Sequence, residues 1–62
     1  MLLGQKIKTA RLAARLTQDA LGRKVGIGQD AISIIEAGHV DPRLKTLRRI
    51  AKALGIEPGA LL

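Results

Sequence analysis

Glycines divide this sequence into short segments, and within each segment the apolar residues recur at the spacing of one face of a helix. In residues 3–16 this face carries Leu3, Ile7, Ala10 and Ala14. Three further segments each end just before a glycine; they are residues 18–25, 29–37 and 41–54. A glycine at that position can take the left-handed conformation in which many helices end. The sequence therefore predicts a series of short helices joined by short turns.

Residues that favour helix starts occur at three places. Thr17 can accept a hydrogen bond from the first turn of the helix that follows it, and Asp19 places a negative charge near the positive end of that helix. Asp41 and Pro42 indicate a fourth helix with Asp41 as its cap and Pro42 in its first turn. A second proline, in the pair of residues 57–58, predicts a final short helix within residues 56–62.

The composition limits how these helices can pack. With 62 residues the chain is near the lower limit for one self-sufficient hydrophobic core, so we expect a single domain over residues 1–62. The chain contains no Phe, Tyr or Trp, which leaves Leu, Ile, Val and Ala to form that core. We therefore expect an all-α fold, a compact bundle of four to five short helices.

Charge and composition also favour one class of partner. Eleven Lys and Arg against five Asp and Glu give a net charge of +6, which attracts polyanions such as nucleic acids. Modules that bind single strands usually stack bases on aromatic side chains, so the lack of aromatics favours double-stranded DNA. The chain has no cysteine, which is compatible with a reducing cytoplasm, and no apolar run of signal-peptide or membrane-span length. We expect a cytoplasmic protein that does not bind membranes.

The segment from residue 18 to residue 37 has the spacing of two short helices that meet at a tight turn. Two helices that cross steeply must approach closely, which favours a small residue at Gly22. The sharp turn needs a residue that tolerates positive φ, and Gly26 supplies it. The apolar residues of the segment then point inward; they are Leu21, Val25, Ile27, Ile32 and Ile35.

This segment resembles the Cro and phage-repressor type helix-turn-helix family, also called Xre-type. The resemblance covers essentially the whole chain: it includes the basic first segment, Gln18, the sequence Glu36-Ala-Gly38, the pair Asp41-Pro42 and residues 47–55. It implies a lambda-repressor-like DNA-binding domain whose helix-turn-helix is formed by the second and third helices, with the third helix in the major groove. It also implies a sequence-specific transcriptional repressor that binds a two-fold symmetric DNA site as a homodimer.

The resemblance implies which residues of this chain contact DNA. Gln18 matches a residue that contacts the DNA backbone, and Gln29 matches one that contacts a base edge. A glutamine amide carries both a donor and an acceptor, so it can pair with N6 and N7 of adenine in the major groove. Asp30 can accept a hydrogen bond from N4 of cytosine, and Ser33 is compatible with several bases.

Gly28 and Ile34 lie in the DNA-contacting region but depart from the family pattern. Family members often place Ser or Thr at the position of Gly28 as the cap of the recognition helix, and glycine caps a helix almost as well. The position of Ile34 faces the groove and is commonly polar. The methyl groups of Ile34 can contact a thymine methyl, or the side chain can serve ordinary packing or a contact with a partner protein.

Four charged residues complete the expected site and its support. Arg43 and Lys45 are close to the loop of residues 38–41, where a phosphate can bind, so both are candidate contacts to the DNA backbone. Arg11 and Glu36 match a pair that the family uses as a largely buried salt bridge between the first and third helices. We expect this pair to support the fold rather than to contact DNA.

Two further expectations concern protein partners. Leu61 and Leu62 are expected contacts between the two copies of a homodimer, because an exposed apolar end favours association. The alternative function is a protein-interaction module, such as an antitoxin or adaptor domain, and Ile34 is the residue that most favours it. A basic amphipathic membrane binder would be disordered in water, which disagrees with helices that end in defined turns.

No combination of residues indicates catalysis, a metal or a cofactor. Ser33 has no matching His and acid, and the glycines do not match a phosphate-binding loop. His39 is the only histidine and has no second nitrogen or thiolate ligand near it in the sequence. We therefore expect a protein without enzymatic activity, metal, cofactor or small-molecule ligand.

Overall fold

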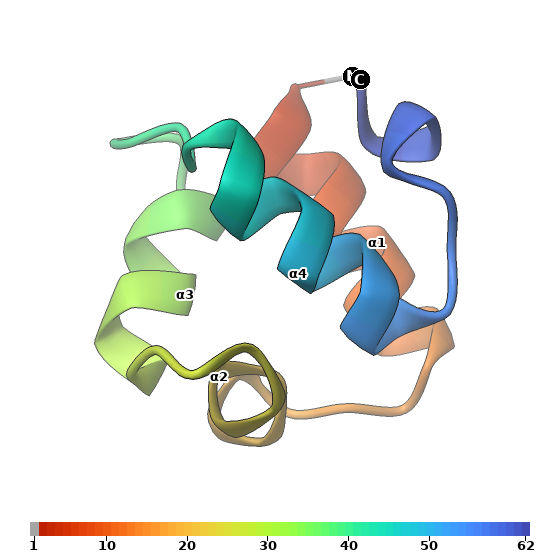
Figure 1. Cartoon of the computed structure of the whole chain (residues 1–62). Coiled ribbons are helices and arrows are strands. Elements are labelled where there is room, and N and C mark those ends of the chain that lie inside the picture. Colours follow the sequence, from red (N-terminus) through yellow and green to blue (C-terminus); the bar gives the residue numbers. More distant parts are fainter. Residues whose placement is uncertain (1) are drawn as a thin grey trace.

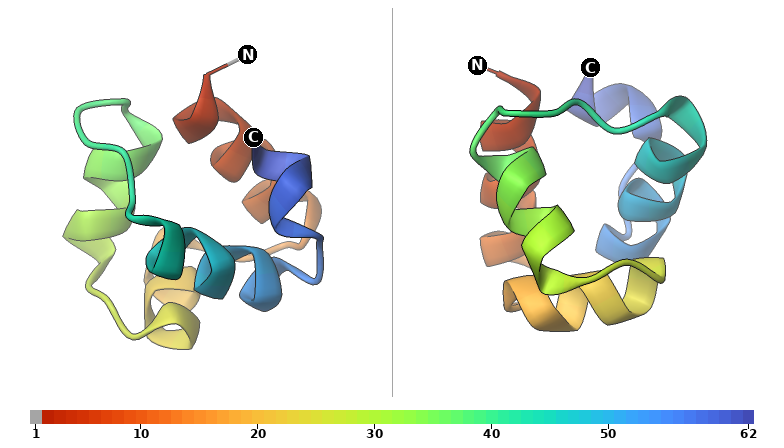
Figure 2. Two further views of the ribbon diagram at one scale, coloured as in Figure 1. Left: turned by 45° about the horizontal axis from the view of Figure 1, so that its top comes forward. Right: turned by 90° about the vertical axis from the view of Figure 1, so that its left-hand side faces the viewer.

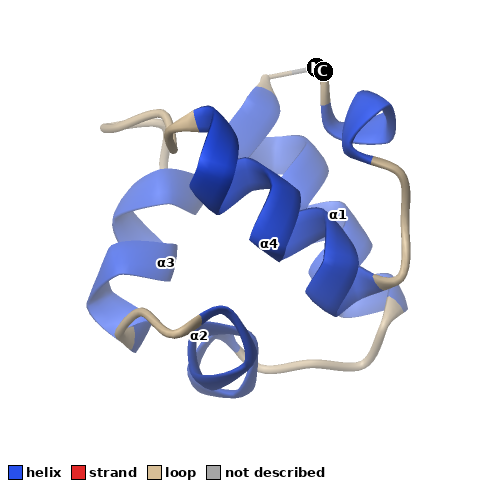
Figure 3. Cartoon of the chain, in the orientation of Figure 1, coloured by secondary structure: helices blue, strands red, loops and turns tan. Residues whose placement is uncertain are grey.

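The computed structural model describes residues 2–62, which form four α-helices and one 3-10 helix around an aliphatic core (Figure 1). The elements are α1 (Leu3–Ala13), α2 (Gln18–Val25), α3 (Gln29–Glu36), α4 (Leu44–Leu54) and the 3-10 helix η1 (Pro58–Leu61). Between them the described residues form only loops and turns, with no strand (Figure 3). The predicted all-α bundle of four to five short helices is confirmed.

Every helix contributes aliphatic side chains to the core. The buried side chains are Ile7, Leu21, Val25, Ile32, Ile35, Leu47, Ile50, Ala51 and Leu61. Helix α2 contacts α3 and α4, while α1 contacts α3, α4 and η1, so the elements enclose one common interior. Ile27, in the turn between α2 and α3, is partly buried against the same core. The inward positions predicted for the helix-turn-helix segment are therefore confirmed.

Local signals set both ends of α2 and its approach to the next turn. The hydroxyl oxygen of Thr17 accepts a hydrogen bond from the backbone N–H of Ala20 at 3.0 Å, as predicted for a cap. Gly26 ends the helix with φ of +88°, a left-handed conformation that costs a glycine nothing. A Cβ on Gly22 would lie 2.6 Å from the carbonyl oxygen of Ile27, so the close approach predicted there is confirmed.

A second close approach, between α1 and α3, was not predicted from the sequence. Gly4 is buried in the first turn of α1. A Cβ on this residue would meet the carbonyl oxygens of Ile35 and Glu36, at the C-terminal end of α3. Any larger side chain at position 4 would therefore push the backbones of α1 and α3 apart.

Helix α1 is shorter than the predicted segment of residues 3–16. It ends at Ala13, and Arg15 follows in a left-handed conformation with φ of 59°. The N–H of Arg15 donates to the carbonyl of Leu12 and the N–H of Leu16 donates to the carbonyl of Arg11, at 3.0 and 3.1 Å. Leu16 is then turned back to pack against the core. No glycine marks the end of this helix in the sequence. The packing of Leu16 against the core compensates for the steric cost of the left-handed conformation at Arg15.

We expect the substitution Arg15→Gly to stabilise the protein by about 0.5–1 kcal/mol. An L residue in the left-handed region costs about 1–2 kcal/mol, and the greater freedom of glycine in the unfolded chain offsets part of the gain. The measurement is the free energy of unfolding in urea. Arg15→Ala is the matched control, since alanine removes the same side chain but keeps the steric cost; equal stabilities of the two variants would contradict the explanation.

Helix α4 begins two residues later than the sequence predicted. Asp41, Pro42 and Arg43 are not helical, and Arg43, rather than Asp41, is the residue before the first turn. The helix must lie where Leu47 and Ile50 reach the core, and the non-helical residues 37–43 connect it to the end of α3. An Asp-Pro pair indicates a helix start from local sequence alone and does not show how far the chain must travel before the helix can reach the core. The predicted capping by Asp41 is therefore wrong.

Candidate functional site

Helix α3 has one face in the core and the opposite face at the surface. Ile32 and Ile35 are 0% and 7% exposed. Gln29, Asp30 and Ser33 are exposed on the other side, and Ile34, which lies beside them, is 45% exposed. In the right-hand view of Figure 2, α3 lies at the front of the molecule with α2 below it. The four predicted contact residues of α3 therefore share one accessible surface.

The first turn of α3 is open around its cap. Gly28 precedes the helix in an extended conformation, and its carbonyl accepts hydrogen bonds from the N–H groups of Ala31 and Ile32 at 3.1 and 3.2 Å. No side chain caps the helix, and a Cβ on Gly28 would meet nothing within 4 Å. Asp30 in this turn places a negative charge at the positive end of the helix dipole. Gly28 thus occupies the predicted cap position, with room for another molecule beside it.

A buried ionic network joins α1, α2 and α3. The guanidinium of Arg11 donates to both carboxylate oxygens of Glu36, from Nε at 2.7 Å and from Nη2 at 3.0 Å. Its Nη1 donates to the carbonyl of Leu16 at 2.8 Å. Arg11 and Glu36 are only 7% and 8% exposed. The predicted structural salt bridge is therefore confirmed, and its two-pronged geometry fixes the orientation of α3 against α1.

Gln18 belongs to the same network. Its side-chain Nε2 donates to Oε1 of Glu36 at 3.2 Å. An amide group carries two N–H donors, so one remains available for a second acceptor while the first holds the side chain in place. Gln18 is half-buried at the start of α2, where the helix dipole is positive. This arrangement presents a positioned donor to an anion at the N-terminus of α2.

The N-terminus of α4 is also positively charged. It has no acidic residue in its first turn and no side-chain cap, so its first N–H groups lack the partners that a cap would provide. Arg43 at the cap position and Lys45 in the first turn are both exposed. Free N–H groups, the helix dipole and two cations together attract an anion such as a phosphate.

One of the two expected dimer contacts is wrong. Leu61 is only 1% exposed, because η1 turns its side chain into the core of its own chain. It therefore has no surface left to offer to a second copy. Leu62 is 70% exposed, and its carbonyl accepts a hydrogen bond from Nζ of Lys6 at 2.6 Å. Of the predicted pair, only Leu62 presents an apolar side chain to solvent.

Across residues 2–62, His, Asp and Glu side chains nowhere gather in groups of three or more that would hold a metal ion. In the same part of the chain, no helix is long and apolar enough to cross a membrane.

Comparison with known proteins gives one consistent result. A family model described as helix-turn-helix matches residues 7–61. The immunity repressor protein of Bacillus phage phi105 is 37% identical over 62 residues, which is 100% of this chain and 43% of the repressor. The chain thus spans less than half the length of that relative. An uncharacterized helix-turn-helix type transcriptional regulator of Methanocaldococcus jannaschii is 40% identical over 52 residues, 84% of this chain and 79% of the regulator.

A solved structure shows the same architecture. The c2 repressor of Salmonella phage P22, crystallised with a synthetic operator, superimposes with a TM-score of 0.94 at 35% identity. The match covers 100% of this chain and 94% of that one. The fold described above is therefore shared with this repressor.

Proposed function

Because this chain belongs to the Cro and phage-repressor type (Xre-type) helix-turn-helix family, we propose that it is a sequence-specific transcriptional regulator that binds double-stranded DNA. Helix α3 enters the major groove in this proposal. The observation that carries it is the outer face of α3, with Gln29, Asp30, Ser33 and Ile34 accessible together. The repressor of phage P22, whose architecture this chain shares, was crystallised with an operator.

Two anion-attracting groups support the same proposal. Gln18 at the start of α2 offers a positioned amide N–H, and Arg43 and Lys45 surround the uncapped start of α4. We assign contacts with the DNA backbone to these three residues. Phosphate contacts fix the register of a protein on DNA, while contacts with base edges provide sequence specificity. Gly28 lets the backbone at the start of α3 approach the DNA closely.

The test is a titration of labelled DNA duplexes at several salt concentrations. Each phosphate that is neutralised releases counterions, so the logarithm of the affinity falls linearly with the logarithm of the salt concentration. A duplex selected from a random pool is compared with a scrambled duplex of equal length. We expect the selected duplex to bind more tightly by about 10³-fold or more. Equal affinities for the two duplexes would reject sequence-specific binding.

We expect the substitution Gln29→Ala to weaken binding to the selected duplex by about 5- to 150-fold. The amide makes a bidentate contact with a base, which is worth about 1–3 kcal/mol of discrimination. The salt dependence of binding should stay the same, because no phosphate contact is lost. Lys45→Ala is the matched control: it should weaken binding to both duplexes alike and reduce the salt slope by about one. A Gln29 variant that loses affinity equally for both duplexes would contradict its assignment.

The second candidate function is a protein-interaction module that uses the same helix as a docking surface. The observation that favours it is Ile34, an apolar side chain 45% exposed in the middle of the polar face of α3. The two functions differ in the titration described above. A docking module would bind the selected and the scrambled duplex alike, and only weakly, because its net charge of +6 attracts any duplex at low salt.

We further propose that the protein acts as a homodimer on a two-fold symmetric site in the cytoplasm, and that it has no catalytic role. Two half-sites about one helical turn apart would then face the two copies of α3. Of the two contacts between copies that the sequence predicted, Leu62 remains a candidate, because 70% of its surface is exposed. Sedimentation with and without a duplex that contains both half-sites tests the dimer directly.

A further inference from the structure

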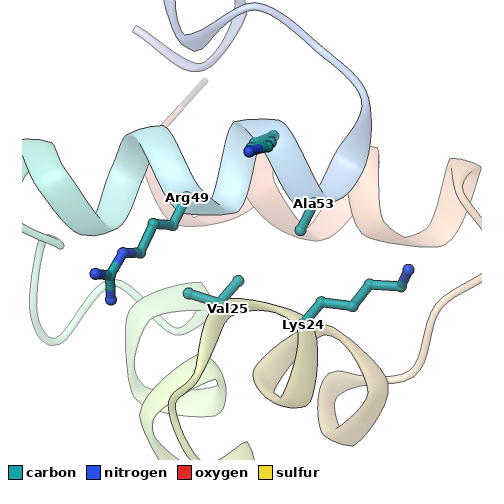
Figure 4. Close-up of a pocket in the computed structure, with 5 residues that line it drawn as sticks. Lys24, Val25, Arg49 and Ala53 are labelled. Atoms are coloured by element: carbon teal, nitrogen blue, oxygen red, sulfur yellow. The ribbon is translucent and has the colours of Figure 1, made fainter.

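A basic pocket lies between α2 and α4, on residues that the proposed DNA contacts do not include. It has a volume of about 480 Å³ and is lined by Lys24, Val25, Arg49, Lys52 and Ala53 (Figure 4). Pockets that hold small-molecule ligands usually measure about 300–1,000 Å³. Three of its five lining residues are cations and none is acidic.

The cations of this pocket have no ionic partner within the described chain. The ion pairs found among residues 2–62 are Arg11 with Glu36 and Arg23 with Asp19, and neither involves a pocket residue. Lys24 and Lys52 lie in the last turns of α2 and α4, where a cation favourably opposes the helix dipole. Arg49 lies in the middle of α4, where the dipole provides no such reason. Arg49 is exposed, so its guanidinium is free to pair with an acidic group of a ligand.

The arrangement of charge and apolar surface defines the shape of that ligand. In Figure 4 the side chains of Arg49 and Lys24 extend toward opposite ends of the pocket, with Val25 and Ala53 between them. A ligand that carries negative charge at both ends and an aliphatic group in the middle matches the whole surface.

We propose that this pocket binds an acidic segment of a partner protein, with carboxylates on either side of an aliphatic side chain. The carboxylates pair with Arg49 at one end and Lys24 at the other, and the aliphatic group lies on the half-buried Ala53 and the methylene stems of the basic side chains. A DNA backbone matches the pocket less well, because it carries no aliphatic side chain to place beside Ala53. The proposal does not depend on DNA binding by α3.

The position of the pocket allows a partner to bind there without covering the outer face of α3. Lys24 follows Gln18 by six residues, which is about 9 Å along the axis of α2 and a different side of that helix. Helix α3 contributes no residue to the pocket. A peptide can therefore occupy the pocket without covering the outer face of α3.

The test uses nuclear magnetic resonance titrations of the whole 62-residue chain with three synthetic peptides. The first is the capped peptide Glu-Glu-Leu-Leu-Glu-Glu, the second replaces its glutamates with glutamines, and the third replaces its leucines with serines. We expect the first peptide to shift the amide signals of Val25 and Ala53 most, and the other two to bind at least about fivefold more weakly. Equal binding by either altered peptide would overturn the proposal.

Matched charge reversals on α4 test which basic residues the peptide contacts. Arg49→Glu should weaken binding of the first peptide about tenfold, since it replaces an attraction with a repulsion. Arg48→Glu changes the net charge equally, but Arg48 is exposed and does not line the pocket, so it should change the affinity less than about threefold. Lys52→Glu provides a second variant at the pocket, and dispersed amide spectra verify that each variant is folded.

Two outcomes would contradict the assignment of this pocket to a peptide. Equal weakening by Arg48→Glu and Arg49→Glu would mean that the peptide binds the positive surface in general. A duplex titration provides the other comparison, because a DNA backbone in the pocket would make Arg49→Glu reduce duplex affinity several-fold more than Arg48→Glu does. Equal effects of the two reversals on duplex binding, with unequal effects on peptide binding, are expected.

Discussion

Replacement of Arg11 by alanine is expected to unfold most of the protein. The substitution leaves the carboxylate of Glu36, which is 8% exposed, without the guanidinium that holds both of its oxygens. Stranding a buried charge in this way costs about 3–5 kcal/mol. The whole stability of a chain of this length is roughly 3–9 kcal/mol, so the loss is comparable with the total. Far-ultraviolet circular dichroism and urea denaturation measure the effect.

A double substitution tests whether the stranded charge is the cause. In Arg11→Met combined with Glu36→Leu, no charge remains buried, and apolar side chains occupy the same space. Replacing a buried ion pair by apolar residues is often neutral, so we expect the double variant to be more stable than Arg11→Ala. A melting temperature of Arg11→Ala equal to that of the unaltered protein would show that the pair contributes little.

Replacement of Ile32 by alanine is expected to have the second largest effect, a loss of about 2–5 kcal/mol of stability. Ile32 is 0% exposed and connects α3 to the core. Truncation removes apolar contacts and leaves a cavity that the neighbouring side chains fill only in part. An eight-residue helix is not stable alone in water, so α3 depends on this anchor to keep its outer face in position.

Ile34→Ala is the matched control, since it makes the same truncation on the same helix. Ile34 is 45% exposed, and a surface substitution usually changes stability by no more than about 0.5 kcal/mol. Urea denaturation of the two variants should therefore separate them clearly. In duplex titrations at a temperature where both are folded, Ile34→Ala is expected to have the larger effect on binding. Equal stabilities of the two variants would contradict the assignment of Ile32 to the buried face of α3 and of Ile34 to its exposed face.

Much of the helix-turn-helix was predictable because its signals are local. The bounds of α2, Gln18–Val25, are the predicted ones, since Thr17 caps one end and Gly26 ends the other within one turn. The pairing of Arg11 with Glu36 spans 25 positions and was predicted only through the resemblance to the family. The partner of either residue cannot be inferred from the residues next to it, because a salt bridge between distant positions produces no pattern in the local sequence.

Other features depended on contacts between distant segments. Gly4 lies in a helical segment, and only the crossing of α1 over α3 shows why a side chain is excluded there. The left-handed Arg15 and the late start of α4 arise because the chain must bring Leu16 and Leu47 to a common core. Local propensity is a weak preference that tertiary packing overrides by a few kcal/mol.

The sequence by itself determined the class of the fold, the limits of α2, the inner and outer faces of α3 and the family. The first three follow from the period of apolar residues and from residues that cap or end a helix, which act within one or two turns, whereas the family follows from the resemblance of the whole chain. Only the tertiary structure decided that Leu61 is buried while Leu62 is exposed, and that Arg49 and Lys24 share a pocket. Both outcomes depend on how separate helices are placed against each other, and burial is a property of that arrangement rather than of neighbouring residues.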